Sequence, residues 1–363
     1  ENPVVPLALD KWERHIIDND RPGRAVFIHA IDLDGDAIKD IVTGRCWYKN
    51  PGKSSGKWER NLVGEGFGNV AIPYDFDADG DMDLLGTSGE PVNKVPTDLV
   101  WAENNDSGVF KIHTNIPKPE GDFLQGVTPL RTHMFKPIQI ALSWHAKDYN
   151  DVQLLKVPKK PAESDWELVS ISKHSQREAL SAGHIDDDIE LDLLLGTKWL
   201  QNINKGETWK IHSFGPIEGS PDRNRLVDIN NDGRPDAVAG FEAVNKPGKV
   251  AWYNCPENPT AQWQENIISN ELIGPMSMDV ADFDRDGDYD VVAGEHNRTQ
   301  EEAGVYLFEN SDGVGGKWVK HLVSKGYEHH DGTIAVDIDN DGDVDIISIG
   351  WRHNNVIFYE NKA

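Results

Sequence analysis

Short runs of apolar and aromatic residues, each bounded by turn-forming residues, follow one another along most of this chain, which is the pattern of buried strands. Typical runs are Val291-Val292-Ala293-Gly294 and Trp252-Tyr253-Asn254, where an apolar or aromatic stretch ends in a turn-forming residue. Helical periodicity is almost absent, and no linker or low-complexity stretch divides residues 1–363. The pattern predicts an all-β protein with a single domain.

One motif recurs seven times and sets the period of the chain. It is an aromatic residue followed by polar positions and an aliphatic or aromatic residue. Successive copies begin between 43 residues (Trp166 to Trp209) and 56 residues (Phe110 to Trp166) apart. This is the length of a four-stranded propeller blade. The copies begin at Trp12, Trp58, Phe110, Trp166, Trp209, Trp263 and Trp318.

A second motif, an aromatic strand that ends in Asn, precedes most of these copies, as in Trp47 to Asn50 and Phe308 to Asn310. The first tryptophan strand, at Trp12, has no earlier strand in its repeat, and the last repeat stops after its third strand. Closing a ring removes exposed sheet edges. We therefore expect a seven-bladed β-propeller of four-stranded antiparallel blades, in which the N-terminal strand completes the last blade.

The third motif is the most specific, because it places carboxylates at positions 1, 3, 5 and 9 of a short loop with Gly at position 6. Ala37 replaces this Gly in the first copy, His184 to Asp192 is a degenerate copy, and Thr132 to Pro137 lacks the carboxylates. The predicted ligands are Asp32, Asp34, Asp36, Asp40, Asp75, Asp77, Asp79, Asp83, Asp228, Asn230, Asp232, Asp236, Asp282, Asp284, Asp286, Asp290, Asp337, Asp339, Asp341 and Asp345.

These loops favour calcium, which takes six to eight oxygen ligands. The pattern resembles the first half of an EF-hand loop, but the Glu at position 12 and the flanking helices are missing. Calcium would be structural here, since it neutralises carboxylates that otherwise repel one another. The alternative is a solvated acidic turn without metal.

Composition narrows the possible partners. The formal net charge is −26, and such an acidic chain is a poor ligand for nucleic acid or for an anionic membrane surface. No apolar run is long enough for a membrane span. The two cysteines, Cys46 and Cys255, either pair or remain buried thiols. Because the chain starts with Glu1, we expect a mature secreted or periplasmic protein, and we expect a monomer.

Candidate chemistry lies on the connections opposite the acidic loops, where propellers usually bind ligands. Arg binds carboxylates in a bidentate way and Trp stacks on sugar rings, so this set suits an acidic saccharide. The alternative is a ring of solvated polar side chains. The predicted substrate-binding residues are Arg45, Trp47, Trp144, Lys198, Trp199, Arg223, His296, Trp351 and His353. The predicted catalytic residues on these connections are His145, His330 and Arg352.

The innermost strands give a further candidate. His29 stands three residues before the first acidic loop, where it is either a buried, hydrogen-bonded histidine or a catalytic acid or base. At the same position of two neighbouring blades stand Arg225 and Asp279, which we expect to pair. No pair of glycosidase carboxylates can be chosen from the 62 acidic residues.

The acidic loops resemble the FG-GAP/VCBS propeller repeat. Together with the Tyr48 to Gly52 strand end and the seven-fold repeat, they make the chain similar to carbohydrate-active propellers: the α-L-rhamnosidases and rhamnose–glucuronate lyases that act on arabinogalactan and, more distantly, the ulvan lyases. In the rhamnosidase branch the resemblance implies a lone catalytic histidine at the channel, a role that His29 could fill. In the lyase branches it implies His, Tyr and Arg residues that neutralise the uronate and remove its C5 proton. Residues compatible with that role are His145, His296, His330, His353, Arg45 and Arg352.

The first expectation is therefore a secreted enzyme that cleaves a rhamnose–glucuronate type linkage in an acidic plant or algal polysaccharide, as an α-L-rhamnosidase. A polysaccharide lyase that works by β-elimination is the alternative within the enzymes. A calcium-dependent lectin or adhesion propeller would bind saccharide without turnover, and a protein-interaction scaffold would bind none.

Overall fold

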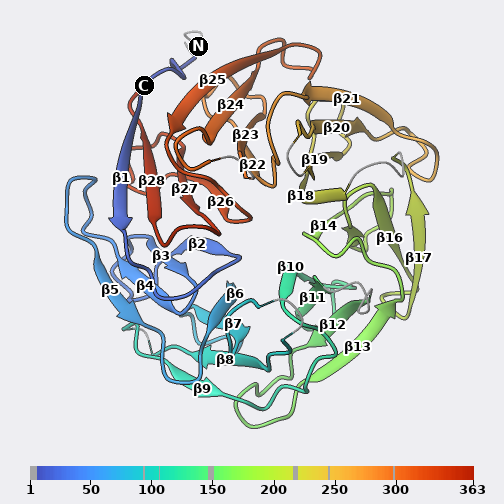
Figure 1. The fold of residues 1–363 in the computed structure, drawn as a ribbon. Coiled ribbons are helices and arrows are strands. Elements are labelled where there is room, and N and C mark those ends of the chain that lie inside the picture. Colours follow the sequence, from blue (N-terminus) through green and yellow to red (C-terminus); the bar gives the residue numbers. More distant parts are fainter. Residues whose placement is uncertain are drawn as a thin grey trace, which may run out of the picture.

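The structure is a computed structural model that describes residues 6–92, 95–105, 107–145, 151–215, 220–243, 246–296 and 299–363. These residues form seven four-stranded antiparallel sheets arranged as the blades of a ring (Figure 1). The described residues contain no helix. The prediction of a seven-bladed all-β propeller is confirmed.

Within each blade the strands are called A to D from the channel outward. Blade 1 has β2 (Ile28–Ile31), β3 (Asp40–Thr43), β4 (Cys46–Lys49) and β5 (Glu59–Leu62); blade 2 has β6 (Asn69–Tyr74), β7 (Asp83–Thr87), β8 (Leu99–Glu103) and β9 (Lys111–His113); blade 3 has β10 (Leu124–Leu130), β11 (Gln139–Trp144), β12 (Val152–Lys156) and β13 (Glu167–Ser172). Blade 4 has β14 (Ser181–Gly183), β15 (Asp192–Leu194), β16 (Lys198–Ile203) and β17 (Thr208–Ser213); blade 5 has β18 (Ser220–Val227), β19 (Asp236–Glu242), β20 (Val250–Asn254) and β21 (Gln264–Ser269). Blade 6 has β22 (Ser277–Ala281), β23 (Asp290–Gly294), β24 (Gly304–Asn310) and β25 (Trp318–Lys325); blade 7 has β26 (Thr333–Val336), β27 (Asp345–Ile349), β28 (Val356–Asn361) and β1 (Trp12–Asp18).

The ring closes through blade 7, whose outer strand comes from the other end of the chain. Strand β1 pairs antiparallel with β28, in a register that runs from Trp12 opposite Asn361 to Ile16 opposite Ile357. Figure 1 shows β1 beside β28, with the two ends of the described chain close together. The predicted closure by the N-terminal strand is confirmed.

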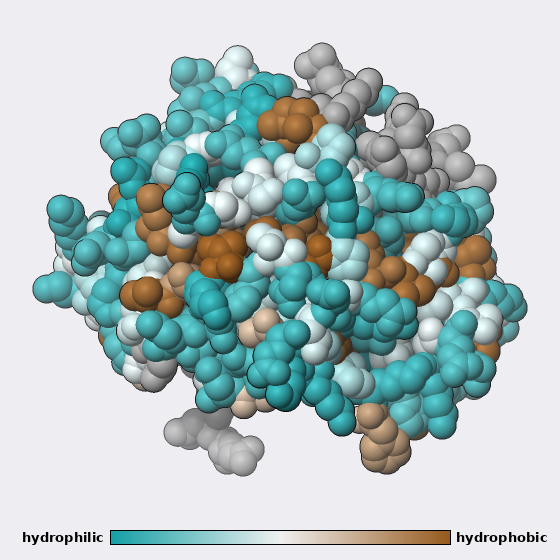
Figure 2. Space-filling view, turned by 90° about the horizontal axis from the view of Figure 1, so that it is seen from below, coloured by the Kyte–Doolittle hydropathy of each residue, from teal (hydrophilic) through white to brown (hydrophobic). Residues whose placement is uncertain are grey.

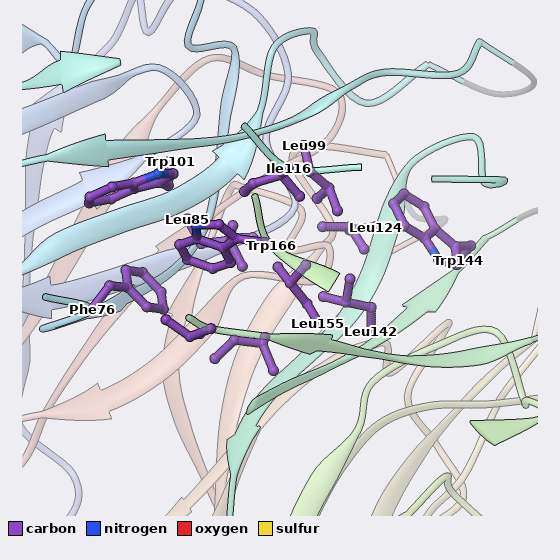
Figure 3. Packing of buried hydrophobic residues seen from close by; sticks show 13 residues of the cluster. Phe76, Leu85, Leu99, Trp101, Ile116, Leu124, Leu142, Trp144, Leu155 and Trp166 are labelled. Atoms are coloured by element: carbon purple, nitrogen blue, oxygen red, sulfur yellow. The ribbon is translucent and has the colours of Figure 1, made fainter. Parts of the chain in front are cut away.

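The recurring tryptophans fill the space between neighbouring blades. Trp101 of blade 2 and Trp166 of blade 3 lie 5.8 Å apart between ring centroids, and Phe76 meets Trp166 edge-on at 5.3 Å. Figure 3 shows this cluster with side chains from both blades. Burial of each such side chain contributes about 1.5–3 kcal/mol, so the aromatic repeat is chiefly a packing signal.

A hydrogen-bonded link recurs at the end of the blades that carries the acidic loops. The Asp at position 9 of the loop is buried and accepts two backbone N–H groups; for Asp290 the donors are Phe283 (3.1 Å) and Asn310 (2.9 Å). The Asn that ends strand C also reaches the preceding blade, as Asn104 does when its Nδ2 donates to the carbonyl of Leu33. The same pair of hydrogen bonds from backbone N–H groups is accepted by Asp40, Asp83, Asp192, Asp236 and Asp345.

The outer surface is mainly polar. Figure 2 views the ring from one side, where hydrophobic residues form a broken row between hydrophilic ones. A membrane-spanning helix was not found in the part of the chain that the structure describes. Cys46 and Cys255 are both buried free thiols, so the two cysteines do not pair.

Candidate functional site

The propeller has two unlike faces. The connections between strands A and B, which carry the carboxylate loops, form what we call the acidic face. The connections from strand D to strand A and from strand B to strand C form the opposite face. Between the two faces, the innermost strands enclose a central chamber of about 340 Å³, a size typical of small-ligand sites.

His29 lines this chamber and is partly buried. Its Nε2 lies 2.9 Å from the carbonyl oxygen of Ala71, so Nε2 carries the proton and Nδ1 is the basic nitrogen. Burial lowers the pKa of His29 to about 4, which keeps the ring neutral at physiological pH. The structure thus shows a hydrogen-bonded histidine that also faces a chamber. Close by, Arg225 pairs with Asp279 at 2.6 Å, as the repeat predicts.

Four of the predicted residues come together on the opposite face with two that the sequence did not select. The rings of His296 and His330 are 4.3 Å apart, and Trp351 lies 5.2 Å from His330. Trp351 in turn contacts Phe123 at 6.1 Å, which stacks on His145 at 4.5 Å. The guanidinium of Arg24 lies 4.8 Å from the Trp351 ring. We call this group the histidine patch; it comprises Arg24, Phe123, His145, His296, His330 and Trp351.

Each histidine of the patch has a carboxylate beside it. Nδ1 of His296 is 2.7 Å from Glu328, and Nδ1 of His145 is 3.2 Å from Asp122. Nδ1 of His330 is 2.5 Å from Oδ2 of Asp331. At His296 and His145 this contact is a hydrogen bond, whereas His330 and Asp331 form an ion pair without hydrogen-bond geometry. A carboxylate beside Nδ1 leaves Nε2 for chemistry, which is the arrangement of acid–base catalysts.

The electrostatics of these pairs differ. Burial alone would lower the pKa of His330, but the carboxylates of Asp331, Asp222 and Glu328 together outweigh burial, and the pKa of His330 is raised. Burial alone would raise the pKa of Glu328, but hydrogen bonds from His296 and from the backbone N–H of Arg352 lower it to about 2. Glu328 is therefore charged at all ordinary pH values, and His330 holds its proton more firmly than a free histidine.

Two other predicted residues, Arg352 and His353, are not part of the patch but bind Glu328, the carboxylate partner of His296. Arg352 donates its backbone N–H to Glu328, and the ring of His353 bonds the Glu328 carbonyl at 2.8 Å. The neighbouring His329 is a core residue: it bonds Ser348 at 2.7 Å, and burial lowers its pKa to about 3. His329 and His330 are adjacent in the sequence, yet the pKa of His329 is lowered by burial and the pKa of His330 is raised by neighbouring carboxylates.

Three of the predicted sugar-stacking residues need a correction. Trp47, Trp144 and Trp199 are only 5%, 1% and 0% exposed, because their rings pack in the core between blades. The stacking role is open only to Trp351, which is half-buried. Arg45 and Lys198 are half-buried at the start of strand C in blades 1 and 4. Among the described residues, no contact joins these two cations to the histidine patch.

The set of predicted site residues includes Arg223 and His330 but not the acids that contact them. Arg223 is 5% exposed and is paired with Asp331 and Asp222. Glu178 also interacts with Arg223, Asp331 and Asp222. Burial raises the pKa of Asp222 to about 7 and that of Glu178 well above its usual value. A signal was present, because Asp222 and Asp331 directly adjoin Arg223 and His330 in the sequence.

On the acidic face the predicted ligands gather in part. In four loops three carboxylates have oxygens within 4.8 Å of one another, and the position-5 residues Asp79, Asp286 and Asp341 lie outside these groups. The remaining loop, from Asp228 to Asp236 in blade 5, forms no such group among the described residues. The loops are numbered below by their blades. The groups are Asp32, Asp34 and Asp36; Asp75, Asp77 and Asp83; Asp282, Asp284 and Asp290; and Asp337, Asp339 and Asp345.

In two of the five loops, predicted metal ligands contact a cationic side chain. The Lys49 ammonium contacts Asp34 and lies 2.9 Å from Asp36. In the loop of blade 5, Arg234 lies 2.5 Å from Asp232. Both side chains supply the positive charge that a metal would otherwise bring.

The other three loops fit a bound cation better. The position-1 residues Asp75, Asp282 and Asp337 each have an Oδ1 that is buried without a hydrogen-bond partner. A buried carboxylate oxygen without a partner is costly, and calcium is a natural partner for several such oxygens. The donor set therefore fits calcium at loops 2, 6 and 7.

These features define a seven-bladed β-propeller with repeated carboxylate loops. The model of the FG-GAP-like repeat matches residues 228–293, from the acidic loop of blade 5 to strand B of blade 6. No curated protein sequence matches the chain.

Similar solved structures include an endo-arabinase from Bacteroides thetaiotaomicron, with 12% identity, a TM-score of 0.40 and coverage of 62% of this chain and 90% of that one. They also include a protein of unknown function from Dyadobacter fermentans (11%, 0.47, 96% and 96%) and AofleA from Arthrobotrys oligospora (11%, 0.44, 87% and 91%). At these identities and TM-scores, none of them assigns a function to this chain.

Proposed function

We propose that the protein is a carbohydrate-active enzyme that cleaves a linkage beside a uronic acid, with its reaction centre in the histidine patch. The observation that carries this proposal is the contact between His296 and His330, each held by its own carboxylate, next to Trp351 and Arg24. This arrangement places a base, an acid, an aromatic surface and a cation within one group of touching side chains.

The chemistry that these residues suit best is β-elimination. Arg24, or the charged His330, offsets the negative charge of the uronate, which makes the C5 proton more acidic. His296 takes that proton through Nε2, since its Nδ1 is held by Glu328. His330 gives its proton to the leaving oxygen on C4, the C4–O bond breaks, and a C4–C5 double bond forms. A rhamnose–glucuronate linkage, as the resemblance implies, has the carboxylate that this scheme needs.

The environment proposed for this activity is extracellular or periplasmic, where such polysaccharides occur and calcium is plentiful. Calcium would stabilise the acidic face. It would act far from the reaction, because the carboxylate loops and the histidine patch lie at opposite ends of the blades.

Incubation with gum arabic and with ulvan tests the proposal. Elimination produces an unsaturated uronate that absorbs ultraviolet light, and we expect this absorbance to rise with wild-type protein. The His296→Gln variant should lose at least about 10²-fold in rate, since it keeps the shape but loses the base. Binding of the saccharide without any cleavage product would instead indicate a lectin and would contradict the proposed activity.

A second candidate, hydrolysis as an α-L-rhamnosidase, is favoured by the central chamber. The chamber offers space for a small sugar and one neutral histidine whose Nδ1 is basic, His29. This candidate predicts free rhamnose without ultraviolet absorbance. It also predicts that His29→Ala abolishes activity while His296→Gln does not.

A further inference from the structure

The side chain of Arg223 spans the central channel. It starts in β18 of blade 5, and its Nη1 and Nη2 donate to the carbonyl oxygen and to Oε1 of Gln125 in blade 3, at 3.0 and 2.9 Å. Its Nε donates to the carbonyl oxygen of Asp331 (3.2 Å), and Nη2 lies 2.6 Å from Oδ1 of the same residue. Arg223 is 5% exposed, so the donors of this guanidinium are directed into the protein.

Asp331 is held between two cations. Oδ1 faces Arg223, and Oδ2 faces Nδ1 of His330. The backbone of Asp331 has a φ of 63°, in the left-handed region that Gly, Asn and Asp adopt more readily than other residues. Arg223 holds Asp331 at two points, because it contacts both the carbonyl oxygen and the carboxylate.

We propose that Arg223 is a positioning residue for the histidine patch: it fixes Asp331 and, through Asp331, the ring of His330. This inference rests on the proposed function for its catalytic consequence, although the geometry that it describes does not. The role of Arg223 is then internal, in place of the substrate contact that its position in the sequence predicts.

Other charges also face His330. Asp222, from the start of β18, and Glu328, two residues before it, both act on the ring electrostatically, and the ring of His296 contacts it. Asp331 has the largest favourable influence among these. A displacement of Asp331 should therefore change the electrostatic surroundings of His330 more than a displacement of Asp222 or Glu328 would.

Proton NMR of the histidine ring N–H signals tests the inference directly. An imidazole Nδ1–H held against a carboxylate gives a far-downfield signal that exchanges slowly. We expect this signal for His330 in wild-type protein, assigned by its loss in His330→Gln, and we expect it to disappear in Arg223→Met. The matched control is Arg225→Met, which breaks the Arg225–Asp279 pair two residues along the same strand and should retain the signal.

Kinetics give the second readout. Misplacement of a catalytic group by about 1 Å costs on the order of 10²-fold, so kcat for elimination should fall about 10²-fold in Arg223→Met with KM little changed. Arg223→Lys should recover part of this loss. If Arg223→Met does not fold, Arg223→Lys replaces it in the NMR comparison, because an ammonium keeps the buried positive charge but lacks the guanidinium geometry that contacts both the carbonyl oxygen and the carboxylate of Asp331.

A His330 signal that persists unchanged in Arg223→Met, or in Arg223→Lys when that variant stands in, would overturn the inference, whatever the activity. Absence of elimination in wild-type protein would overturn the proposed function instead, and the NMR comparison would still decide the role of Arg223.

Discussion

The acidic face and the opposite face are built from the same blades but in different ways. On the acidic face one hydrogen-bond pattern recurs in blade after blade, with a buried Asp that ties the loop to the end of strand C. On the opposite face each connection carries different residues, and the histidine patch takes its members from blades 1, 3, 6 and 7 and the connections between them. Repetition here serves stability, and departure from it provides the candidate chemistry.

The largest effect should come from a change that breaks both faces. Deletion of residues 1–18 removes β1 and exposes the edge of β28, so the ring can no longer close. We expect the midpoint of thermal unfolding to fall by roughly 10 °C or more, or folding to fail altogether. Thermal melting followed by circular dichroism measures this, and an unchanged melt would show that blade 7 does not need its fourth strand.

The next effect should be confined to the acidic face. Asp290→Ala leaves two buried backbone N–H groups, of Phe283 and Asn310, without an acceptor, which costs about 2–6 kcal/mol in the free energy of unfolding. Activity per folded molecule should stay the same. Urea unfolding in the presence of a chelator measures this loss in the free energy of unfolding without a contribution from metal binding. A loss below about 1 kcal/mol would mean that the Asp at position 9 acts only as a metal ligand.

Calcium should distinguish one acidic loop from another. Saturating calcium at 100 times its Kd stabilises a single site by about 2.7 kcal/mol. Asp282→Asn should remove the contribution of one site, so the calcium-dependent rise in melting temperature should be smaller in this variant than in wild-type protein. Asp32→Asn, the matched change in the loop whose Asp34 and Asp36 contact Lys49, should leave that rise intact. Equal effects of the two substitutions would contradict the division of the loops.

The smallest effect concerns pH on the opposite face. The pKa of His330 is raised, so its ion pair with Asp331 stabilises the fold fully below the ordinary histidine pKa of about 6.5. This contribution is lost as the pH rises through the higher pKa of the folded state. The rate of elimination should fall over the same range if His330 donates its proton. In Asp331→Asn the fall should begin at lower pH; a pH–rate profile that does not move would remove His330 from the acid role.

The fold was predictable because a repeat fixes topology. The tryptophan motif gives the blade length, and the unmatched strand at Trp12 gives the closure. The pairing of Arg225 with Asp279 also followed, since both occupy the same position in neighbouring blades.

The site was predictable only in part. His145, His296, His330 and Trp351 were identified by type and position, but the burial of Trp144 and Trp199 depends on how blades pack. The partners of Arg223 lie about a hundred residues away on both sides of the channel, at Gln125 and Asp331. Such contacts arise from ring geometry, which no local pattern in the sequence specifies.

One measurement compares the two possible reaction centres directly: the initial rate on gum arabic of His296→Gln and of His29→Ala, with ultraviolet absorbance and free rhamnose recorded together. If the reaction takes place in the histidine patch, absorbance is lost in the first variant and retained in the second. Loss of rhamnose release in His29→Ala, with His296→Gln fully active, would place the reaction in the central chamber and contradict this account.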